Sequence, residues 1–472
     1  MPVIVLLADG VRPDTLAAAL DDGSLPALAR LRDEAGALHT VTSCFPSVTG
    51  PAYAPFMMGR FPGPVGLPGL RWFDRARTAT RWPDYTRSYV GYQMPALDRD
   101  LDPAAPTIFE LLPPSRSLGA LSVITRGLPA EQRIGGLSAR AVLRAATTHF
   151  SGNVRGWLEI DREVSGQLIQ RVRDERPDFV FAALTGVDKT SHAEGHAAPV
   201  VRDALTIVDE TAAALRADAE RAGTWRETHV WVTSDHGHSS VRWHEDLAGV
   251  VADAGHRVIA HPWIVAVAPD VAVMVSGNAM AHLYLEPARR ERPYWPALRS
   301  RWDDLAEALL ARPSVDLLTV LLDERTAEVR SATRGRSLVR ARADGRFDYL
   351  TTEGDALGVG RALEAVSADE AYEATIGGDY PDSIVQLALL ATAPRSGEIV
   401  LSAARDWDFR SKYEPIPHVS SHGALHREHM LVPLLMNRRP RVAPRRTADV
   451  MPSALTALGV AVPPGLDGSS FL

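Results

Sequence analysis

Three short apolar runs, none with polar alternation, do most to limit the fold of this 472-residue chain. They are Val3–Ala8, Phe179–Leu184 and 228–233. Short runs rich in β-branched residues are typical of strands that are buried on both faces. The stretches 13–20 and 200–219, which lie between these runs, carry apolar residues at helical spacing. Strands that alternate with helices predict an α/β fold with a mostly parallel central sheet flanked by helices.

The pattern loosens after the third run. Short strands are expected at 271–275 and 281–285, joined by a turn at Gly277-Asn278, followed by a helix at 302–310. The domain limits expected from this change are 1–262 and 395–472 for the core and 263–394 for an inserted α+β subdomain that covers its edge. The apolar stretch 398–402 is predicted to resume the strands of the core.

Composition narrows the possible partners. A net charge of -7 gives no basic surface for a nucleic-acid polymer. No apolar run reaches about 18 residues, so neither a membrane span nor a membrane partner is expected. The one cysteine, Cys44, excludes an internal disulfide. With a beginning unlike a signal peptide, it favours a cytoplasmic protein. The oligomeric state stays open.

A stretch poor in charge, 43–59, contains the candidate nucleophile. A helix could start at Pro51, because proline is tolerated in a first turn. Thr49 stands just before it, where unpaired backbone N–H groups favour an anion such as phosphate. Two interpretations are open here: Thr49 is a helix cap, or it is a nucleophile that attacks a phosphate.

Metal-ligand residue types stand at four places, each after a predicted strand. They are Asp9 after the first run, Asp188 and His192 after the second, Asp235 and His236 after the third, and His422 after 398–402. Each alone has a simpler explanation as a turn or loop residue. Together they are informative, because the carboxyl ends of parallel strands meet at one edge of a sheet. Three carboxylates gathered there would repel one another without cations.

This set predicts two divalent metal ions, with Thr49 as a further oxygen ligand. Oxygen and nitrogen ligands without a thiolate suit zinc, with manganese or iron as alternatives. Two metal ions about 4 Å apart are a known arrangement for phosphoryl transfer.

These motifs resemble the alkaline phosphatase superfamily, and specifically its type I phosphodiesterase/nucleotide pyrophosphatase branch. The matching segments are LLADG at Asp9, TGPAYAPFMMG at Thr49, TGVDKTSH at Asp188 and His192, TSDHGHS at Asp235 and His236, and SHG at His422. Thr49 and Gly59 also keep the branch's ten-residue spacing. The resemblance implies an alkaline-phosphatase-like core and a metal-dependent phosphoric ester hydrolase.

The resemblance also implies roles for the site residues. One metal ion is assigned to Asp188, His192 and His422. The other is assigned to Asp9, Thr49, Asp235 and His236. Thr49 would attack a small phosphate-ester substrate in line, most simply a diester or a nucleotide-type pyrophosphate, and form a phospho-threonine that water then releases.

One departure concerns the phosphate oxygens. The branch usually places an asparagine about twenty residues after the threonine, and here that position falls at or near Leu70-Arg71. Arg71 is therefore a candidate for this role, since its guanidinium fork suits phosphate oxygens. The missing asparagine puts the preference for a diester in doubt.

Other chemistries stay open on the same site. A phosphomonoesterase or a phosphonoacetate-type C–P hydrolase would share the metal ligands, and a phosphotransferase would use an acceptor other than water. A sulfatase would use Cys44, but the arginine of the sulfatase motif is replaced by Val48. A non-catalytic metal-binding protein is the alternative from another class. Lys189, Glu194, His196, His238 and His426 lie beside ligands in sequence and are expected to be outer-shell or loop residues.

Overall fold

The computed structural model describes residues 1–76, 85–91, 93–135, 143–144, 146–148, 151–262, 264, 267–410 and 418–472. Within them, a sheet of seven strands lies at the centre, in the order β2-β21-β8-β1-β7-β5-β6. Its strands are β1 (Val3–Ala8), β2 (Ala37–Thr42), β5 (Ser117–Ala120), β6 (Arg133–Ile134), β7 (Phe179–Leu184), β8 (His229–Thr233) and β21 (Leu431–Met436). β1, β5, β6, β7 and β8 are parallel, and β21 is antiparallel to both of its neighbours. The predicted α/β fold is confirmed.

Helices cover both faces of this sheet, as the unbroken apolar strands require. Alternate residues of β1 enter two different cores: Val3, Val5 and Leu7 pack with α3 and α15, and Ile4, Leu6 and Ala8 pack with α1, α2, α7 and α9. Burying one such side chain stabilises the fold by about 1.5–3 kcal/mol. The helices of the described chain are α1 (Pro13–Asp21), α2 (Pro26–Glu34), α3 (Ala54–Met58), α4 (Leu97–Asp100), α5 (Ile108–Leu111), α7 (Val154–Glu175), α8 (Gly186–Glu194), α9 (Pro199–Arg221), α10 (Leu247–Asp253), α11 (Trp295–Leu310), α12 (Ala368–Thr375), α13 (Ser383–Thr392), α14 (Arg427–Met430) and α15 (Val450–Leu458).

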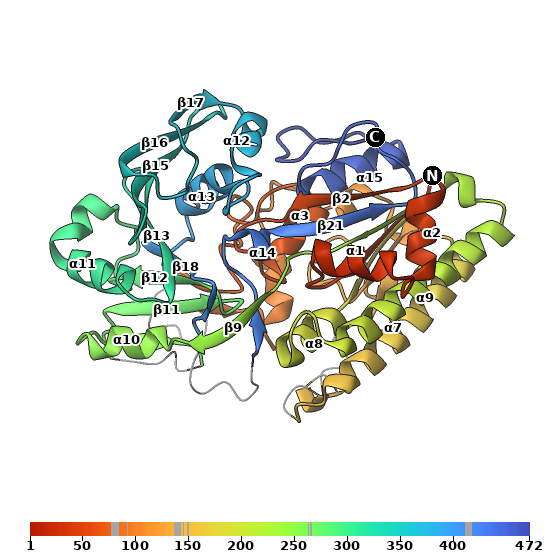
Figure 1. Cartoon of the computed structure of the whole chain (residues 1–472), viewed down its shortest axis with the longest axis horizontal. Coiled ribbons are helices and arrows are strands. Elements are labelled where there is room, and N and C mark those ends of the chain that lie inside the picture. The colour runs from red at the N-terminus through yellow and green to blue at the C-terminus, as the bar shows by residue number, and fades with distance from the viewer. Residues whose placement is uncertain are drawn as a thin grey trace.

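A second sheet forms the other lobe of the molecule, at the left of Figure 1. In the described residues it has nine strands, in the order β10-β11-β12-β18-β13-β14-β15-β16-β17. They are β10 (Val258–Ala260), β11 (Val271–Ser276), β12 (Met280–Leu285), β13 (Val315–Leu321), β14 (Thr326–Ser331), β15 (Gly335–Ala341), β16 (Phe347–Gly354), β17 (Leu363–Val366) and β18 (Ile399–Ala403). α10 and α11 pack on one face of this sheet, and α12 and α13 pack on the other.

The strand predicted at 398–402 exists as β18, but it does not resume the core. It lies inside the second sheet, antiparallel to both β12 and β13. Its residues alternate between two apolar clusters, so its sequence looks the same as that of a strand buried in the central sheet. β10 also belongs to the second sheet, so this sheet extends beyond both predicted limits of the insertion. Residue 263, the predicted start, lies outside the described residues, and the domain limits stay a prediction.

Small sheets complete the fold around the edge of the core. β9 (Ser239–His244) pairs with β19 (Asp406–Asp408) and β20 (Ser420–Ser421), and β3 (Arg71–Phe73) pairs with β4 (Thr86–Ser88). The region 93–135 supplies the short strands β5 and β6 to the central sheet. Among the described residues, every helix is too short or too polar to span a bilayer.

Candidate metal centre and nucleophile

Polar side chains gather where three parallel strands of the central sheet end. Asp9 follows β1, Asp188 lies in the first turn of α8 after β7, and Asp235 and His236 follow β8. Because β1 is hydrogen-bonded in parallel to both β7 and β8, these strand ends lie at one edge. Asp161 of α7 accepts hydrogen bonds from Thr185 N and Gly186 N, and so secures the start of α8.

The first set of contacts, here the Thr49 group, consists of Asp9, Thr49, Asp235 and His236. Thr49 Oγ1 donates to Asp9 Oδ1 at 3.3 Å and lies 3.1 Å from His236 Nε2. His236 Nε2 is 3.4 Å from Asp9 Oδ1 and 3.5 Å from Asp235 Oδ2. Four residues predicted to share one metal ion therefore meet in one place.

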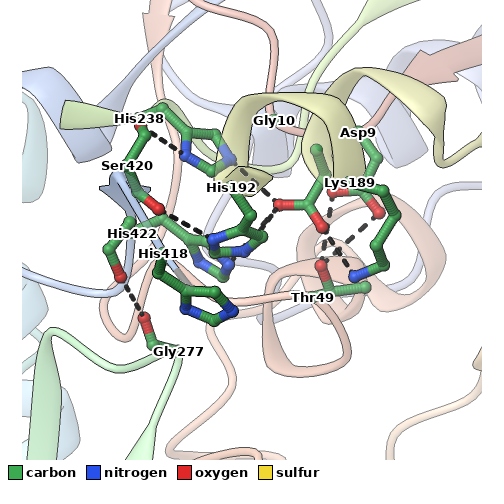
Figure 2. A network of polar contacts seen from close by, with 12 residues as sticks. Asp9, Gly10, Thr49, Lys189, His192, His238, Gly277, His418, Ser420 and His422 are labelled. Carbon is green, nitrogen blue, oxygen red and sulfur yellow. Dashed lines mark hydrogen bonds and ion pairs between the residues drawn. The ribbon is translucent and has the colours of Figure 1, made fainter. Parts of the chain in front are cut away.

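The second set, here the Asp188 group, consists of Asp188, His192, His238 and His422, and Figure 2 labels its three histidines. Asp188 Oδ1 lies 3.2 Å from His192 Nε2, 2.9 Å from His238 Nε2 and 3.6 Å from His422 Nε2. Lys189 Nζ donates to the other oxygen, Asp188 Oδ2, at 2.8 Å. The three ligands predicted for the second ion therefore lie together, and the imidazole of His238 lies beside them.

The two groups touch each other. The rings of His236 and His422 are stacked, with centroids 3.7 Å apart and an angle of 7° between their planes. Ligand atoms of Asp188, His236, His238 and His422 lie within 4.8 Å of one another, as do those of Asp9, Asp235 and His236. Two adjacent ions could be held here.

Hydrogen bonds orient the predicted imidazole ligands. The Nδ1 atoms of His192, His236 and His422 bond the carbonyl oxygens of Ser420, Gly237 and Ser47, at 2.8, 3.1 and 3.0 Å. A carbonyl oxygen only accepts, so each Nδ1 carries a proton and Nε2 is the nitrogen that faces the site. Holding the far nitrogen in this way is the usual arrangement for metal-binding histidines.

The electrostatics of the site call for cations. Burial, followed by repulsion from Asp235 and Asp188, raises the pKa of Asp9 well above its usual value. Burial also raises the pKa of Asp235. Its Oδ2 atom is buried and has no hydrogen-bond partner among the described residues. For Asp188, burial acts to raise the pKa, but Lys189 and His192 outweigh it, and the pKa falls well below normal. The donor set fits divalent metal ions, which would satisfy these carboxylates.

Thr49 is not a helix cap. Gly50, at a φ of 102°, occupies the cap position before a 3-10 turn at Pro51–Tyr53, which continues into α3. The cap makes no side-chain hydrogen bond. The Thr49 hydroxyl turns instead to Asp9 and His236, which favours the interpretation of Thr49 as a nucleophile.

Cys44 lies in an apolar cluster shared with the second sheet and outside the two groups of ligands, although the charge of Asp235 reaches it. Its Sγ contacts Pro46 O at 3.7 Å, and burial raises the pKa of the thiol. A buried, protonated thiol is a poor nucleophile. This position does not favour the sulfatase alternative.

Arg71 is the first residue of β3. Its backbone exchanges hydrogen bonds with the Ser276 hydroxyl at the end of β11. Burial, and then the positive charge of Arg71, lower the pKa of His261 to about 4, which places the guanidinium near that ring. The role of Arg71 stays a prediction.

The second sheet contributes a turn that lies next to the site. The sequence predicted a turn at Gly277-Asn278, but it gave no sign of this position. Gly277, between β11 and β12, has a φ of +58°, and a Cβ there would lie 2.0 Å from Val48 Cγ2 and 3.1 Å from His422 Nδ1. Only glycine lets this turn approach both the nucleophile loop and a predicted ligand so closely. No local sequence signal could have shown this contact.

His238 is the other residue that the sequence analysis did not assign to the site. It is completely buried, and burial lowers its pKa to about 3, so the imidazole is neutral. The signal was present in TSDHGHS, since His238 stands only three residues after Asp235.

Comparisons with known proteins agree with this geometry. Residues 3–425 match the model of the type I phosphodiesterase / nucleotide pyrophosphatase family. No curated protein matches the chain. Among solved structures, phosphonoacetate hydrolase from Sinorhizobium meliloti 1021, in complex with phosphonoformate, has a TM-score of 0.58 at 17% identity, over 97% of this chain and 95% of that one.

Murine ectonucleotide pyrophosphatase/phosphodiesterase 5 is also similar in fold. It has a TM-score of 0.56 at 15% identity, covering 99% of this chain and 98% of that one. The human protein has a TM-score of 0.57 at 14% identity, over 99% and 97% of the two chains. The chain therefore belongs to the type I phosphodiesterase/nucleotide pyrophosphatase family of the alkaline phosphatase superfamily, and is a metal-dependent hydrolase of phosphoric esters.

Proposed function

We propose that this protein hydrolyses a phosphate diester or a nucleotide-type pyrophosphate bond, with two divalent metal ions and Thr49 as the nucleophile. The observation that carries the proposal is the position of Thr49 Oγ1, 3.3 Å from Asp9 Oδ1 and 3.1 Å from His236 Nε2. A hydroxyl held among metal-ligand side chains is placed to attack phosphorus. In agreement with this, an inactive threonine-to-alanine variant of the murine neighbour has been solved in complex with AMP.

The metal ions are assigned to the two groups described above. Asp9, Thr49, Asp235 and His236 would hold one ion, and Asp188, His192 and His422 would hold the other. Zinc is the first choice for these oxygen and nitrogen donors, with manganese or iron as alternatives. Bound there, the ions supply charge that stabilises the attacking and leaving oxygens.

The protein's own atoms then carry the reaction in two displacements. Thr49 Oγ1 forms a bond to phosphorus while the bond to the leaving oxygen breaks, which gives a phospho-threonine and a free alcohol or phosphate. Water then attacks the same phosphorus and releases Thr49. Asp9, which accepts the Thr49 hydrogen bond, orients the hydroxyl for the first displacement, in which Oγ1 gives up this proton.

Phosphomonoester and phosphonate hydrolysis are the competing functions on this site. The bacterial neighbour has been solved with phosphonoacetate and the murine one with AMP, so neither ligand class is preferred by the fold alone. The decisive experiment compares nitrophenyl esters of a phosphate diester, a phosphate monoester and a sulfate, with phosphate release from phosphonoacetate in parallel. We expect the diester to have the highest kcat/KM. A faster monoester, sulfate ester or phosphonate would overturn the proposal.

Arg71 is proposed to bind a non-bridging phosphate oxygen. We expect Arg71→Ala to lower kcat by about 10²-fold, the scale of losing one transition-state hydrogen-bond donor. Arg71→Lys should recover only part of the loss, because an ammonium cannot form the two parallel bonds of a guanidinium. Steady-state kinetics on the diester measure both variants, and an unchanged rate in Arg71→Ala would remove this residue from the site.

We propose that the reaction takes place in the cytoplasm. The single buried cysteine supports a reducing compartment such as the cytoplasm. A small phosphate ester, rather than a nucleic-acid polymer or a membrane, is the proposed partner.

A further inference from the structure

We propose that His238 is a ligand of the metal ion at Asp188, which is then bound by one carboxylate and three imidazoles: those of His192, His238 and His422. The inference rests on the two-metal function proposed above and adds to it a ligand that the family resemblance does not assign. It follows from distance, from the proton positions in a hydrogen-bond chain, and from the packing around the ring.

The distance is the first argument. His238 Nε2 lies 2.9 Å from Asp188 Oδ1, closer than either His192 Nε2 at 3.2 Å or His422 Nε2 at 3.6 Å. All three nitrogens therefore converge on the same carboxylate oxygen.

The proton positions are the second argument. The Ser420 hydroxyl donates its only proton to Ser239 O at 2.9 Å, so Ser420 Oγ must accept from His238 Nδ1, which is 3.1 Å away. Nδ1 therefore bears a proton, and Nε2 is the nitrogen that faces Asp188 Oδ1, 2.9 Å away. Nε2 is thus the atom that would bind an ion at Asp188, with Nδ1 held from behind as in other metal-binding histidines.

The same arrangement holds the predicted ligands. Ser420 binds two histidines at once: its backbone oxygen accepts from His192 Nδ1, and its hydroxyl accepts from His238 Nδ1 (Figure 2). In both rings Nε2 points inward, toward Asp188. His238 is thus oriented as His192 is, by the same residue of β20.

The ring is also fixed in place from its other sides. It meets the rings of His192 and His422 edge-on, with centroids 4.8 and 5.2 Å away. A Cβ on Gly10 would lie 2.9 Å from its Cδ2 and Nε2 atoms, so the backbone after β1 packs against it closely. His238 cannot swing away from Asp188 without disturbing the strand end that carries Asp9.

The two groups differ in their donor atoms, so the two ions should be bound with different affinities. The Thr49 group offers two carboxylates, one imidazole and a neutral hydroxyl, which is a weak ligand. The Asp188 group offers a carboxylate and three imidazoles that are already oriented. We therefore expect the ion at Asp188 to be bound more tightly and to be the last one removed by a chelator.

The test counts imidazoles by X-ray absorption spectroscopy at the zinc edge. The sample is the Asp235→Ala variant loaded with one equivalent of Zn²⁺. This substitution weakens the Thr49 group. We expect three imidazoles per zinc, and two after the further change His238→Gln. The affinity for Zn²⁺, measured against a competing chelator, should fall by about 10-fold or more in His238→Gln.

Two control variants accompany this test. Ser420→Ala removes the hydroxyl that orients His238 but leaves the ring, so it should lower the affinity while the count stays at three. His196→Gln makes the same change at a histidine that lies by Arg12 and Asp14, and should alter neither value.

The outcomes separate this inference from the proposed function. Two imidazoles per zinc before His238 is changed would overturn the inference, and this measurement needs no His238 variant to fold. An unchanged count in His238→Gln would also overturn it. If the unaltered protein bound fewer than two metal ions while active, the proposed function itself would fail.

Discussion

Replacing Thr49 by alanine is expected to lower kcat/KM for a phosphate diester by about 10⁴-fold or more. Thr49 Oγ1 is the hydroxyl that lies among the ligands of the Thr49 group, and its loss removes the atom that forms the bond to phosphorus. Losses of this size are typical when a covalent nucleophile is deleted. Stopped-flow or endpoint assays with a nitrophenyl diester measure the effect.

Two companion variants show whether the effect belongs to the Thr49 hydroxyl. Thr49→Ser keeps a hydroxyl on the same backbone atom and should retain most of the activity. Ser47→Ala removes a nearby hydroxyl that donates to Ala424 O, outside the two metal-ligand groups, and should lower the rate by far less than Thr49→Ala. A Thr49→Ala protein with full activity would defeat the Thr nucleophile and bring Cys44 back into consideration.

Removing the metal ions is expected to abolish activity and to lower thermal stability. Asp9, Asp188 and Asp235 are at most 2% exposed, and without cations their charges repel in a medium that solvates them poorly. An ion present at 100 times its Kd would stabilise the folded state by about 2.7 kcal/mol. Dialysis against a chelator, followed by assay and by differential scanning calorimetry, measures both effects.

Restoring the ions gives the matching control. Zn²⁺, Mn²⁺ or Fe²⁺ added to the metal-free protein should recover both the rate and the melting temperature, and the most effective ion identifies the native choice. Asp235→Ala should bind one ion fewer than the unaltered protein by elemental analysis. Full activity with fewer than two bound ions per chain would count against the two-metal mechanism.

The sequence was most informative where a local pattern has a single structural meaning. β1 and β7 are apolar at every position, and β8 at its three central positions, because helices cover both faces of the sheet, and each ends in a polar motif. The parallel pairing that follows from alternating strands and helices was enough to predict that Asp9, Asp188 and Asp235 meet.

The sequence was least informative where the same pattern has two structural meanings. β18 is buried on both faces, as a core strand is, but it pairs with β12 and β13 in the second sheet. β5 and β6 have four and two residues, too few for a periodicity to be recognised. His422 reaches the site through β20, which pairs with β9, and not from the end of a core strand.

The amino-acid sequence by itself determined the fold class, the family and the residues that could form a metal site, because strand length, helical spacing and motif order are properties of short segments. Only the tertiary structure decided that His238 faces Asp188, that Gly277 closes on Val48, and that the Arg71 backbone meets Ser276. These contacts join residues far apart in the chain or depend on side-chain direction. The contact of Gly277 with Val48 arises where the second sheet packs against the core, and no local pattern records that packing.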